Sequence, residues 1–315
     1  MRIPESKHFQ IQRLEDGVYA VVASETGHAI CNAGIIDTGE TAIVFDTFIS
    51  PKAAKDLLRA ARLLAPKNSI RVVNSHYHND HIRGNQVFPP GVDILSTTTT
   101  REKIAHREPE VIEWEKQNIP KALTEAKSEL NLEKDSRRHQ DLAIQVAYHE
   151  AILESHLNLK TRLPNITFEG DLMIHGTRRD VELLSLAGHT VSDLVLYLPD
   201  EKVAFMSDLL FIGAHPYLAS GSPELCKKSL NTIRKLGAQT LVPGHGPVGK
   251  SSDLSIMIRY IQSLETIARN MVKKGVPAGE ARLQPIPKPF DKWLFEEYFA
   301  DNLGFLHRLL SQETS

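Results

Sequence analysis

The sequence predicts an α/β protein whose two strand-rich halves, each with its own helix, form an αββα sandwich. Short apolar runs rich in valine and isoleucine, typical of buried strands, fall into two blocks at residues 18–95 and 166–242. A helical pattern accompanies each block, at 51–64 and 223–236. The 315 residues suit one large domain, 1–315, with helical additions.

In the first block, the strands are interrupted by a helix that begins at a proline. Pro51 suits a first helical turn, because the N–H that proline lacks has no partner there. The helix is expected at 51–64, and the strands are expected at 18–22, 29–36, 41–46, 70–73 and 92–95.

The second block has the same character with shorter strands. Its apolar runs predict strands at 166–168, 172–174, 181–186, 194–198 and 203–206, then a helix at 223–236 and a strand at 240–242.

Between the blocks, residues 99–160 are dense in Glu, Lys, Arg, Gln and Ala and predict a helical insertion. Leucine, isoleucine and valine recur there at near-helical spacing, which indicates two or three helices. We interpret the insertion as a lid or pocket wall, as a homodimer contact, or as a solvated appendage; the first two interpretations are compatible with each other.

A second helical addition is predicted at the C-terminal end, over 251–315. Breaks are expected at 275–277 and 285–289, where glycine and proline interrupt the helical pattern. The aromatic residues after the second break are expected to pack on the sandwich or on a partner subunit.

The composition excludes several classes of partner. A formal net charge of −2 gives no electrostatic reason to expect binding to nucleic acid or an anionic membrane. No apolar stretch is long enough to span a bilayer, and the first residues lack an apolar signal core. Cys31 and Cys226 are too few for a disulfide framework and are expected to be buried small hydrophobic residues. A cytoplasmic location is expected.

The most informative segment reads His-Tyr-His-Asn-Asp-His at residues 76–81. Imidazole and carboxylate are ligands that zinc accepts, so His76, His78, Asp80 and His81 predict a metal site. The apolar run at 70–73 precedes them, which is typical of a strand that delivers ligands into a loop at its C-terminal end.

Three later residues are candidates for the remaining ligands. His189, Asp208 and His245 each follow a short apolar run, and both histidines lie beside glycine. Glycine permits the sharp turns and close backbone approach that a ligand-bearing loop needs.

The chain resembles the metallo-β-lactamase superfamily. The resemblance rests on five motifs that occur in the family's order, namely Asp46 at a strand end, the 76–81 run, Gly188-His189-Thr190, Ser207-Asp208 and Pro243-Gly244-His245-Gly246. It implies the αββα fold, and it leaves the substrate unspecified.

The resemblance also implies a dinuclear site. His76, His78 and His189 would hold the first metal ion, Asp80, His81 and His245 the second, and Asp208 would bridge them. The nitrogen-rich set favours two Zn²⁺, although iron or manganese also accepts these ligands. Asp46 would orient a ligand histidine through its second ring nitrogen; the alternative is a turn-capping aspartate.

Hydrolysis is the leading prediction for function. A metal-bridging hydroxide would attack a carboxylic ester, lactone or thioester, with Asp80 as a candidate proton shuttle. Phosphoester hydrolysis is the alternative. Weak β-lactam hydrolysis is a lesser one, because a bridging aspartate at the Asp208 position departs from true β-lactamases. Phe211 stands where lactonase relatives place a tyrosine. A di-iron redox enzyme is less favoured, since its relatives replace His78 with glutamate.

The segment 213–217 follows Asp208 and is expected to pass near the site. His215 and Tyr217 are therefore candidates for hydrogen bonding to a substrate oxygen or a developing oxyanion. The alternative is a loop packed by Pro216 with His215 exposed.

Overall fold

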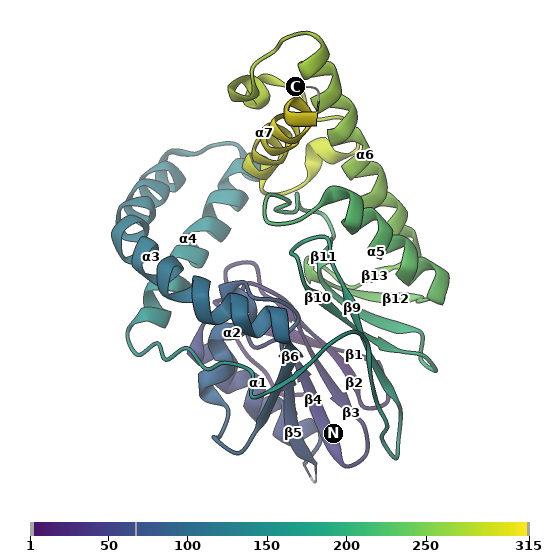
Figure 1. Cartoon of the computed structure of the whole chain (residues 1–315). Helices are drawn as coiled ribbons and strands as arrows, with labels where there is room; N and C mark the ends of the chain where they lie inside the picture. Colours follow the sequence, from purple (N-terminus) through teal and green to yellow (C-terminus); the bar gives the residue numbers. More distant parts are fainter. Residues whose placement is uncertain (1–2, 67, 314–315) are drawn as a thin grey trace.

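A computed structural model describes residues 3–66 and 68–313, and two β-sheets face each other at its centre (Figure 1). The first sheet has seven strands in sequential order, with β4 to β7 parallel. Its strands are β1 (Phe9–Glu15), β2 (Val18–Ala23), β3 (Ala33–Asp37), β4 (Thr41–Phe45), β5 (Ser69–Val73), β6 (Asp93–Thr97) and β7 (Ile166–Phe168).

The second sheet has six strands in the order β13-β12-β11-β10-β9-β8. Its strands are β8 (Leu172–Ile174), β9 (Val181–Leu186), β10 (Asp193–Leu198), β11 (Val203–Phe211), β12 (Thr240–His245) and β13 (Gly249–Lys250). β11 and β12 are parallel, so both strands run toward the same edge of the sandwich.

Helices cover the outer faces of both sheets, as the αββα prediction requires. α1 (Pro51–Leu64) begins at the predicted proline, and its N-cap Ser50 accepts hydrogen bonds from the amides of Lys52 and Ala53. Its buried face packs on the first sheet. α5 (Pro223–Leu236) and α6 (Ser251–Lys273) contribute to the apolar cluster behind the second sheet.

Apolar side chains from the two sheets interdigitate between them. Ile36 and Phe45 from the first sheet lie in one buried cluster with Leu196 and Phe205 from the second. The approach is close at Gly34 of β3, where a Cβ atom added to the glycine would lie 2.6 Å from the Phe205 ring. A glycine at this position therefore sets the spacing between the sheets.

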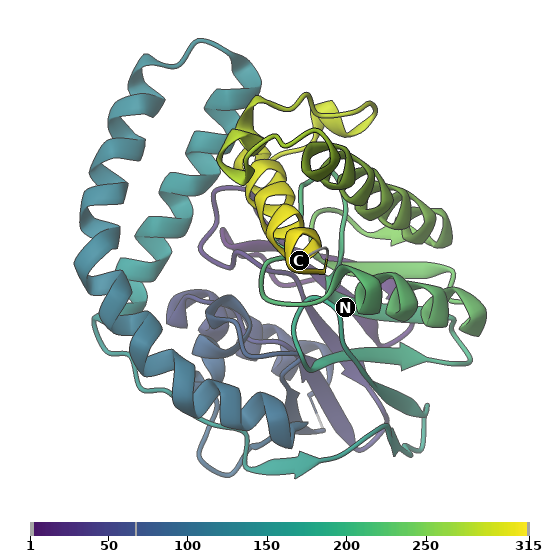
Figure 2. The same cartoon turned by 45° about the horizontal axis from the view of Figure 1, so that its top comes forward.

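The predicted insertion consists of two long helices, α3 (Thr98–Leu132) and α4 (Ser136–His156), which pack against each other. Short helices α2 (Asn79–Ile82), η1 (Arg83–Val87), η2 (Ala278–Leu283) and η3 (Phe290–Lys292) and the terminal α7 (Glu296–Glu313) complete the fold. Figure 2 shows the α3–α4 pair and α7 near one another. The insertion and the C-terminal region touch where the amide of Phe295 donates to Asp141 at 3.0 Å.

Several strands differ from the sequence prediction, among them β1, β3 and β11. β1 was missed because its residues are largely polar and it forms the edge of its sheet. Residues 29–32 precede β3 rather than belonging to it, and Ile30 has a positive φ of 75°. β11 runs through Asp208 to Phe211 instead of ending at 206, because its pairing with β12 continues across two register shifts.

Two prolines of the insertion, Pro109 and Pro120, lie inside the continuous helix α3.

Within residues 3–66 and 68–313, no helix combines the length and the apolar character needed to cross a membrane.

The close approach at Gly34 generates a test of the sandwich. Gly34→Ala should lower the free energy of unfolding by about 1–3 kcal/mol, because the new methyl group overlaps the Phe205 ring. Gly91→Ala is the matched control, since a Cβ at Gly91 meets no atom within 4 Å. Urea unfolding measures both, and equal stability of the two variants would contradict this account of sheet spacing.

Candidate metal centre

The first sheet delivers four of the predicted ligands from the end of β5. His76 and His78 lie in the loop after Val73, and Asp80 and His81 lie in the short helix α2. The second sheet delivers the other three, with His189 after β9, Asp208 within β11 and His245 at the end of β12. The structure thus brings all seven side chains to one edge of the sandwich.

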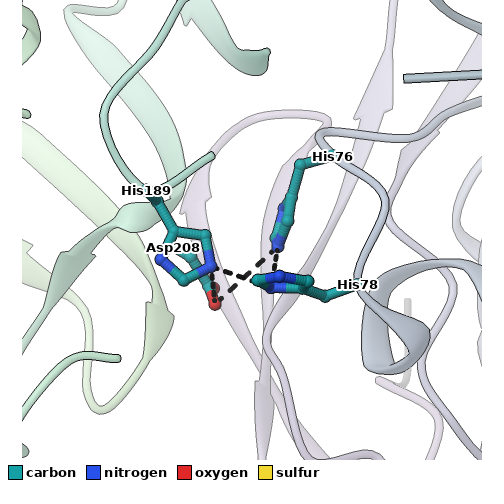
Figure 3. A group of neighbouring side chains, drawn as sticks. All are labelled: His76, His78, His189 and Asp208. Carbon is teal, nitrogen blue, oxygen red and sulfur yellow. Dashed lines mark hydrogen bonds and ion pairs between the residues drawn. The ribbon is translucent and has the colours of Figure 1, made fainter. Parts of the chain in front are cut away.

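His76, His78, His189 and Asp208 form one compact group, in which one potential ligand atom of each lies within 4.8 Å of the others (Figure 3). Nδ1 of His78 lies 3.0 Å from Nε2 of His76 and 2.9 Å from Nε2 of His189. Three imidazole nitrogens that converge in this way present their lone pairs to one point, which is the geometry of ligands around a cation.

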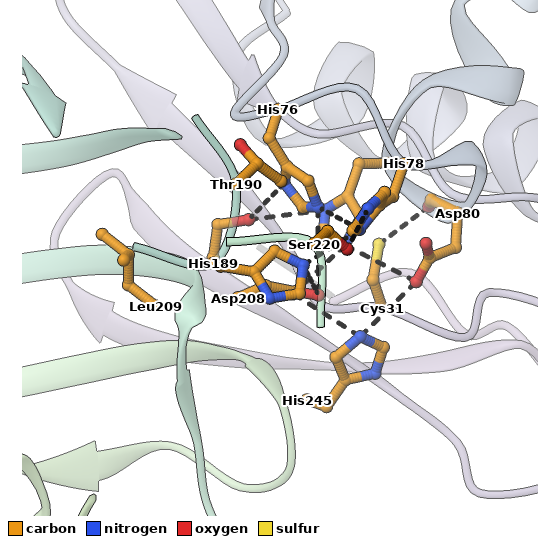
Figure 4. A network of polar contacts seen from close by, with 12 residues as sticks. Cys31, His76, His78, Asp80, His189, Thr190, Asp208, Leu209, Ser220 and His245 are labelled. Carbon is orange, nitrogen blue, oxygen red and sulfur yellow. Dashed lines mark hydrogen bonds and ion pairs between the residues drawn. The ribbon is translucent and has the colours of Figure 1, made fainter. Parts of the chain in front are cut away.

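A second group consists of His81, Asp208 and His245. Figure 4 shows Asp208 and His245 of this group, with Asp80 nearby. Oδ1 of Asp208 lies 3.2 Å from Nε2 of His81 and 3.5 Å from Nε2 of His245. The His245 nitrogen is also 3.4 Å from a carboxylate oxygen of Asp80. Asp208 belongs to both groups and lies between them, as a bridging carboxylate would.

Burial and the neighbouring carboxylates together divide the histidines into neutral and protonated rings. Desolvation holds the pKa of His76 well below its usual range and lowers that of His78 to about 3, so both rings are neutral and able to bind metal. Burial acts in the same direction on His245, but the carboxylates of Asp208 and Asp80 outweigh it and raise its pKa to about 9. In the absence of a cation, that proton compensates the paired carboxylates; a metal ion would displace it.

Buried ligand atoms without hydrogen bonds are a further sign that these residues can hold metal ions. Nε2 of His81 and Oδ1 of Asp208 are buried and lie 3.2 Å apart, yet among the described residues neither atom makes a hydrogen bond. Buried polar atoms are rarely left without partners, because desolvation without a hydrogen bond costs free energy. Divalent cations, bound by His76, His78 and His189 on one side and by Asp80, His81 and His245 on the other, would satisfy these atoms.

Asp46 makes the contact predicted for it. Its Oδ2 lies 2.8 Å from Nδ1 of His81, on the ring edge away from the ligand group. Its two carboxylate oxygens also accept hydrogen bonds from the amide and hydroxyl of Ser75, each at 2.8 Å. The Asp46 backbone has a positive φ of 63°, which is uncommon for a residue other than glycine and is typical of constrained functional positions.

Close backbone packing places the ligands from the second sheet. A Cβ at Gly244, the residue before His245, would lie 1.9 Å from Oδ1 of Asp208. Glycine there lets the β12 end approach the carboxylate, as the motif predicted. His189 is fixed by Asp193, whose carboxylate accepts its amide at 3.0 Å. Burial raises the pKa of Asp193 to about 7, against the effect of its hydrogen bonds.

Three residues at the site were not recognised from the sequence. Cys31 is buried as expected, but its thiol also donates to the Asp80 carbonyl at 3.0 Å. Asn32 donates to the Pro243 carbonyl at 2.9 Å and joins the two sheets beside His245. The Ser220 hydroxyl lies 3.3 Å from Nε2 of His78. No local motif marks these residues, because each reaches the site through a tertiary contact.

The insertion is tied to the ligand segment by a buried ionic network. Arg83, two residues after His81, donates to Glu108 and Glu115 of α3, both at 2.7 Å. Glu115 also accepts from the side chain of Asn79 in α2 at 2.7 Å. Because Arg83, Glu108 and Glu115 are at most 3% exposed, these charges depend on one another. α3 therefore supports the loop that carries Asp80 and His81.

Neither His215 nor Tyr217 belongs to either of the two ligand groups. His215 is completely buried, with Nδ1 2.9 Å from the Tyr260 hydroxyl and its ring against Trp293 and Phe299. The exposed histidine of the alternative interpretation is thus wrong, although the packed loop is present. Tyr217 is 37% exposed, and its ring lies 5.7 Å from that of Tyr298 in α7.

Comparisons with known proteins agree with this architecture. The profile described as "Metallo-beta-lactamase superfamily" matches residues 26–245. Among solved structures, the metallo-beta-lactamase from Pontibacter korlensis is 18% identical with a TM-score of 0.59, and the alignment covers 81% of this chain and 99% of that one.

Two further structures are similarly related in fold. TMB-1 is 17% identical and the DIM-1 metallo-beta-lactamase is 14% identical; each has a TM-score of 0.57, with 82% of this chain and 99% of the other covered. No curated protein matches the chain.

The protein belongs to the metallo-β-lactamase superfamily, as its motifs indicated. It shares the mixed α/β architecture of two sheets and covering helices with these structures, and His and Asp clusters occupy the edge where its sheets meet. Members of this class are mostly metal-binding hydrolases.

The Asp46 contact can be tested through metal affinity. Asp46→Asn keeps the shape of the side chain but removes the charge beside His81, and should weaken binding of one metal ion about 10–100-fold. Competition with a chromophoric chelator measures the effect. Asp200→Asn, on an exposed residue, is the control. Affinity equal to that of the control would remove Asp46 from the metal centre.

Proposed function

We propose that this protein is a dinuclear zinc hydrolase that cleaves a carboxylic ester, lactone or thioester. The observation that carries the proposal is the position of Asp208, whose two oxygens lie 3.3 Å from His189 and 3.2 Å from His81. A carboxylate shared by two imidazole groups suits a pair of divalent cations, because it screens their mutual repulsion.

Bound zinc would supply Lewis acidity toward the substrate oxygen and would acidify a coordinated water. The chain's own residues hold and orient this chemistry. Neutral His76, His78 and His189 present lone pairs rather than protons. Before metal binds, the charges of the histidines around Asp208 outweigh its burial and hold its pKa well below the usual range, so an anion is ready to receive the cations. Asp80 is the proposed proton carrier. Burial raises the pKa of its carboxyl group, but His81 and His245 outweigh burial and lower that pKa to about 2.

The environment of His245 bears on the substrate. The ring of Phe211 stacks on His245 at 4.7 Å, so this position offers an apolar surface and no hydroxyl. Phe211 therefore cannot donate the hydrogen bond that a tyrosine hydroxyl would offer at this position. Phosphoester hydrolysis is the alternative function, and weak β-lactam hydrolysis is a lesser one.

Metal analysis and hydrolysis together test the proposal. Protein purified without added metal should contain about two zinc ions per chain. His189→Ala should lose mainly one of them, and Asp208→Ala should loosen both. Hydrolysis of simple carboxylic and thioesters should disappear with a chelator and return with zinc. Iron with a visible absorption band would instead support the redox alternative, and ester hydrolysis unchanged after metal removal would contradict the proposal.

We also propose that His215 and Tyr217 assist the reaction. Since His215 is enclosed by Tyr260, Trp293 and Phe299, its role would be to position the segment 215–220 rather than to touch substrate. His215→Ala should keep its metal content yet slow turnover up to about a hundredfold, because small displacements in a site have effects of this size.

The exposed His175→Ala is the matched control for this experiment. Tyr217→Phe removes only a hydroxyl, and should raise KM or lower kcat if that hydroxyl binds substrate. Turnover of the metal-replete His215 variant at the control level, with a lower free energy of unfolding, would assign His215 to packing alone.

A further inference from the structure

A cavity of about 350 Å³ lies between the segment after β11 and the C-terminal helices. Tyr217 and Ala219 line one side of it, and residues of η2 and α7 line the other. None of the seven predicted metal ligands is part of its wall. The cavity is therefore a separate feature that the hydrolytic chemistry does not itself explain.

Small residues leave this space open. Ala281 and Gly304 belong to the wall, and a Cβ at Gly304 would approach Nη1 of Arg308 to 3.5 Å. Glycine within a helix costs about 1 kcal/mol relative to alanine. A side chain at this position of α7 would begin to fill the cavity and would contact the Arg308 guanidinium.

The charge of the wall is the second observation. Arg282 and Arg308 both line the cavity, and the only carboxylate among the lining residues is that of Asp301. Throughout residues 3–66 and 68–313, neither guanidinium has an ion pair within 4.0 Å or donates a hydrogen bond, in contrast to Arg83 with its two buried glutamates. Both arginines are exposed to solvent, and with a single carboxylate in the wall they leave the cavity net positive.

A short segment connects this cavity to the metal centre. Ala219 lines the cavity, and the hydroxyl of the next residue, Ser220, lies 3.3 Å from Nε2 of His78. Asn302 of α7 holds this segment in place, because its side chain accepts from the amide of Leu218 at 2.8 Å and donates to the carbonyl of Pro216 at 2.6 Å. Ser220 contacts the ring nitrogen of His78 opposite the one that faces His76 and His189, so this segment lies between the cavity and the ligand group. A substrate long enough to pass the segment would extend from the ligand groups into the cavity.

We propose that the cavity is a specificity subsite for a carboxylate on the substrate, held by Arg282 and Arg308 while the scissile ester lies at the metal centre. The inference rests on the proposed hydrolytic function. Guanidinium groups bind carboxylates through paired N–H donors, and this geometry makes arginine suited to the task. The substrate class is thus an ester or thioester with an acidic group remote from the reacting carbonyl.

A pair of esters tests the subsite. The 4-nitrophenyl monoester of glutaric acid carries the remote carboxylate, and 4-nitrophenyl butyrate is its neutral counterpart. The wild type should prefer the acidic ester. The Arg282→Ala/Arg308→Ala double variant should raise KM for that ester about tenfold or more and leave the neutral ester unchanged, since losing even one hydrogen bond to a charged group has about this effect. Asp301→Asn should increase the preference.

Arg269→Ala, on an exposed arginine of α6 outside the cavity, is the matched control. Binding of glutarate, measured by calorimetry on the metal-loaded protein, provides a readout that needs no turnover, and the double variant should bind it about tenfold more weakly than the control. If the wild type hydrolyses both esters and the double variant keeps the same ratio, the subsite is wrong while the hydrolase stands. If neither ester is hydrolysed, the proposed function fails. If the double variant and the Arg269→Ala control bind glutarate equally well, the subsite is wrong whether or not the esters are hydrolysed.

Discussion

The contact between the Asp208 carboxylate and His81 is the interaction on which the arrangement of the two sheets at the site depends. The carboxylate comes from β11 of the second sheet and lies 3.2 Å from the His81 nitrogen delivered by the first. Both side chains are buried, so their charges interact with little screening by water. Removing either partner would leave an uncompensated charge in the interior. The Asp46–Ser75–Ser207 contacts and the Asn32 hydrogen bonds keep the two sheets in register at this point.

The additions to the sandwich support this centre rather than standing apart from it. The Arg83–Glu115 pair links α3 to the helix that carries Asp80 and His81. Asn302 links α7 to the segment that carries Ser220 beside His78. Each link places a buried polar side chain where its partners fix its geometry. A change in either helical addition would therefore alter the positions of the side chains in the ligand groups.

The outlines of the sandwich and the candidate ligands were predictable because they depend on local sequence. α1 begins at Pro51, and β9 spans the predicted residues 181–186. β1 was missed, since an edge strand with one solvated face need not be apolar. β11 was predicted too short, because its extension past 206 depends on pairing with β12 around the positive φ of Ser207.

The sequence by itself determined which side chains could hold metal, because ligand chemistry is a property of residue type and histidines two residues apart share a loop. Only the tertiary structure decided how the groups divide around Asp208, since that depends on two sheets meeting. It also decided that His215 is enclosed by aromatic rings and that Cys31 reaches the Asp80 carbonyl. The same holds for the cavity with Arg282 and Arg308, whose residues come from separate segments. Contacts between segments distant in the chain leave no local pattern, and so they become visible only once the core has brought the segments together.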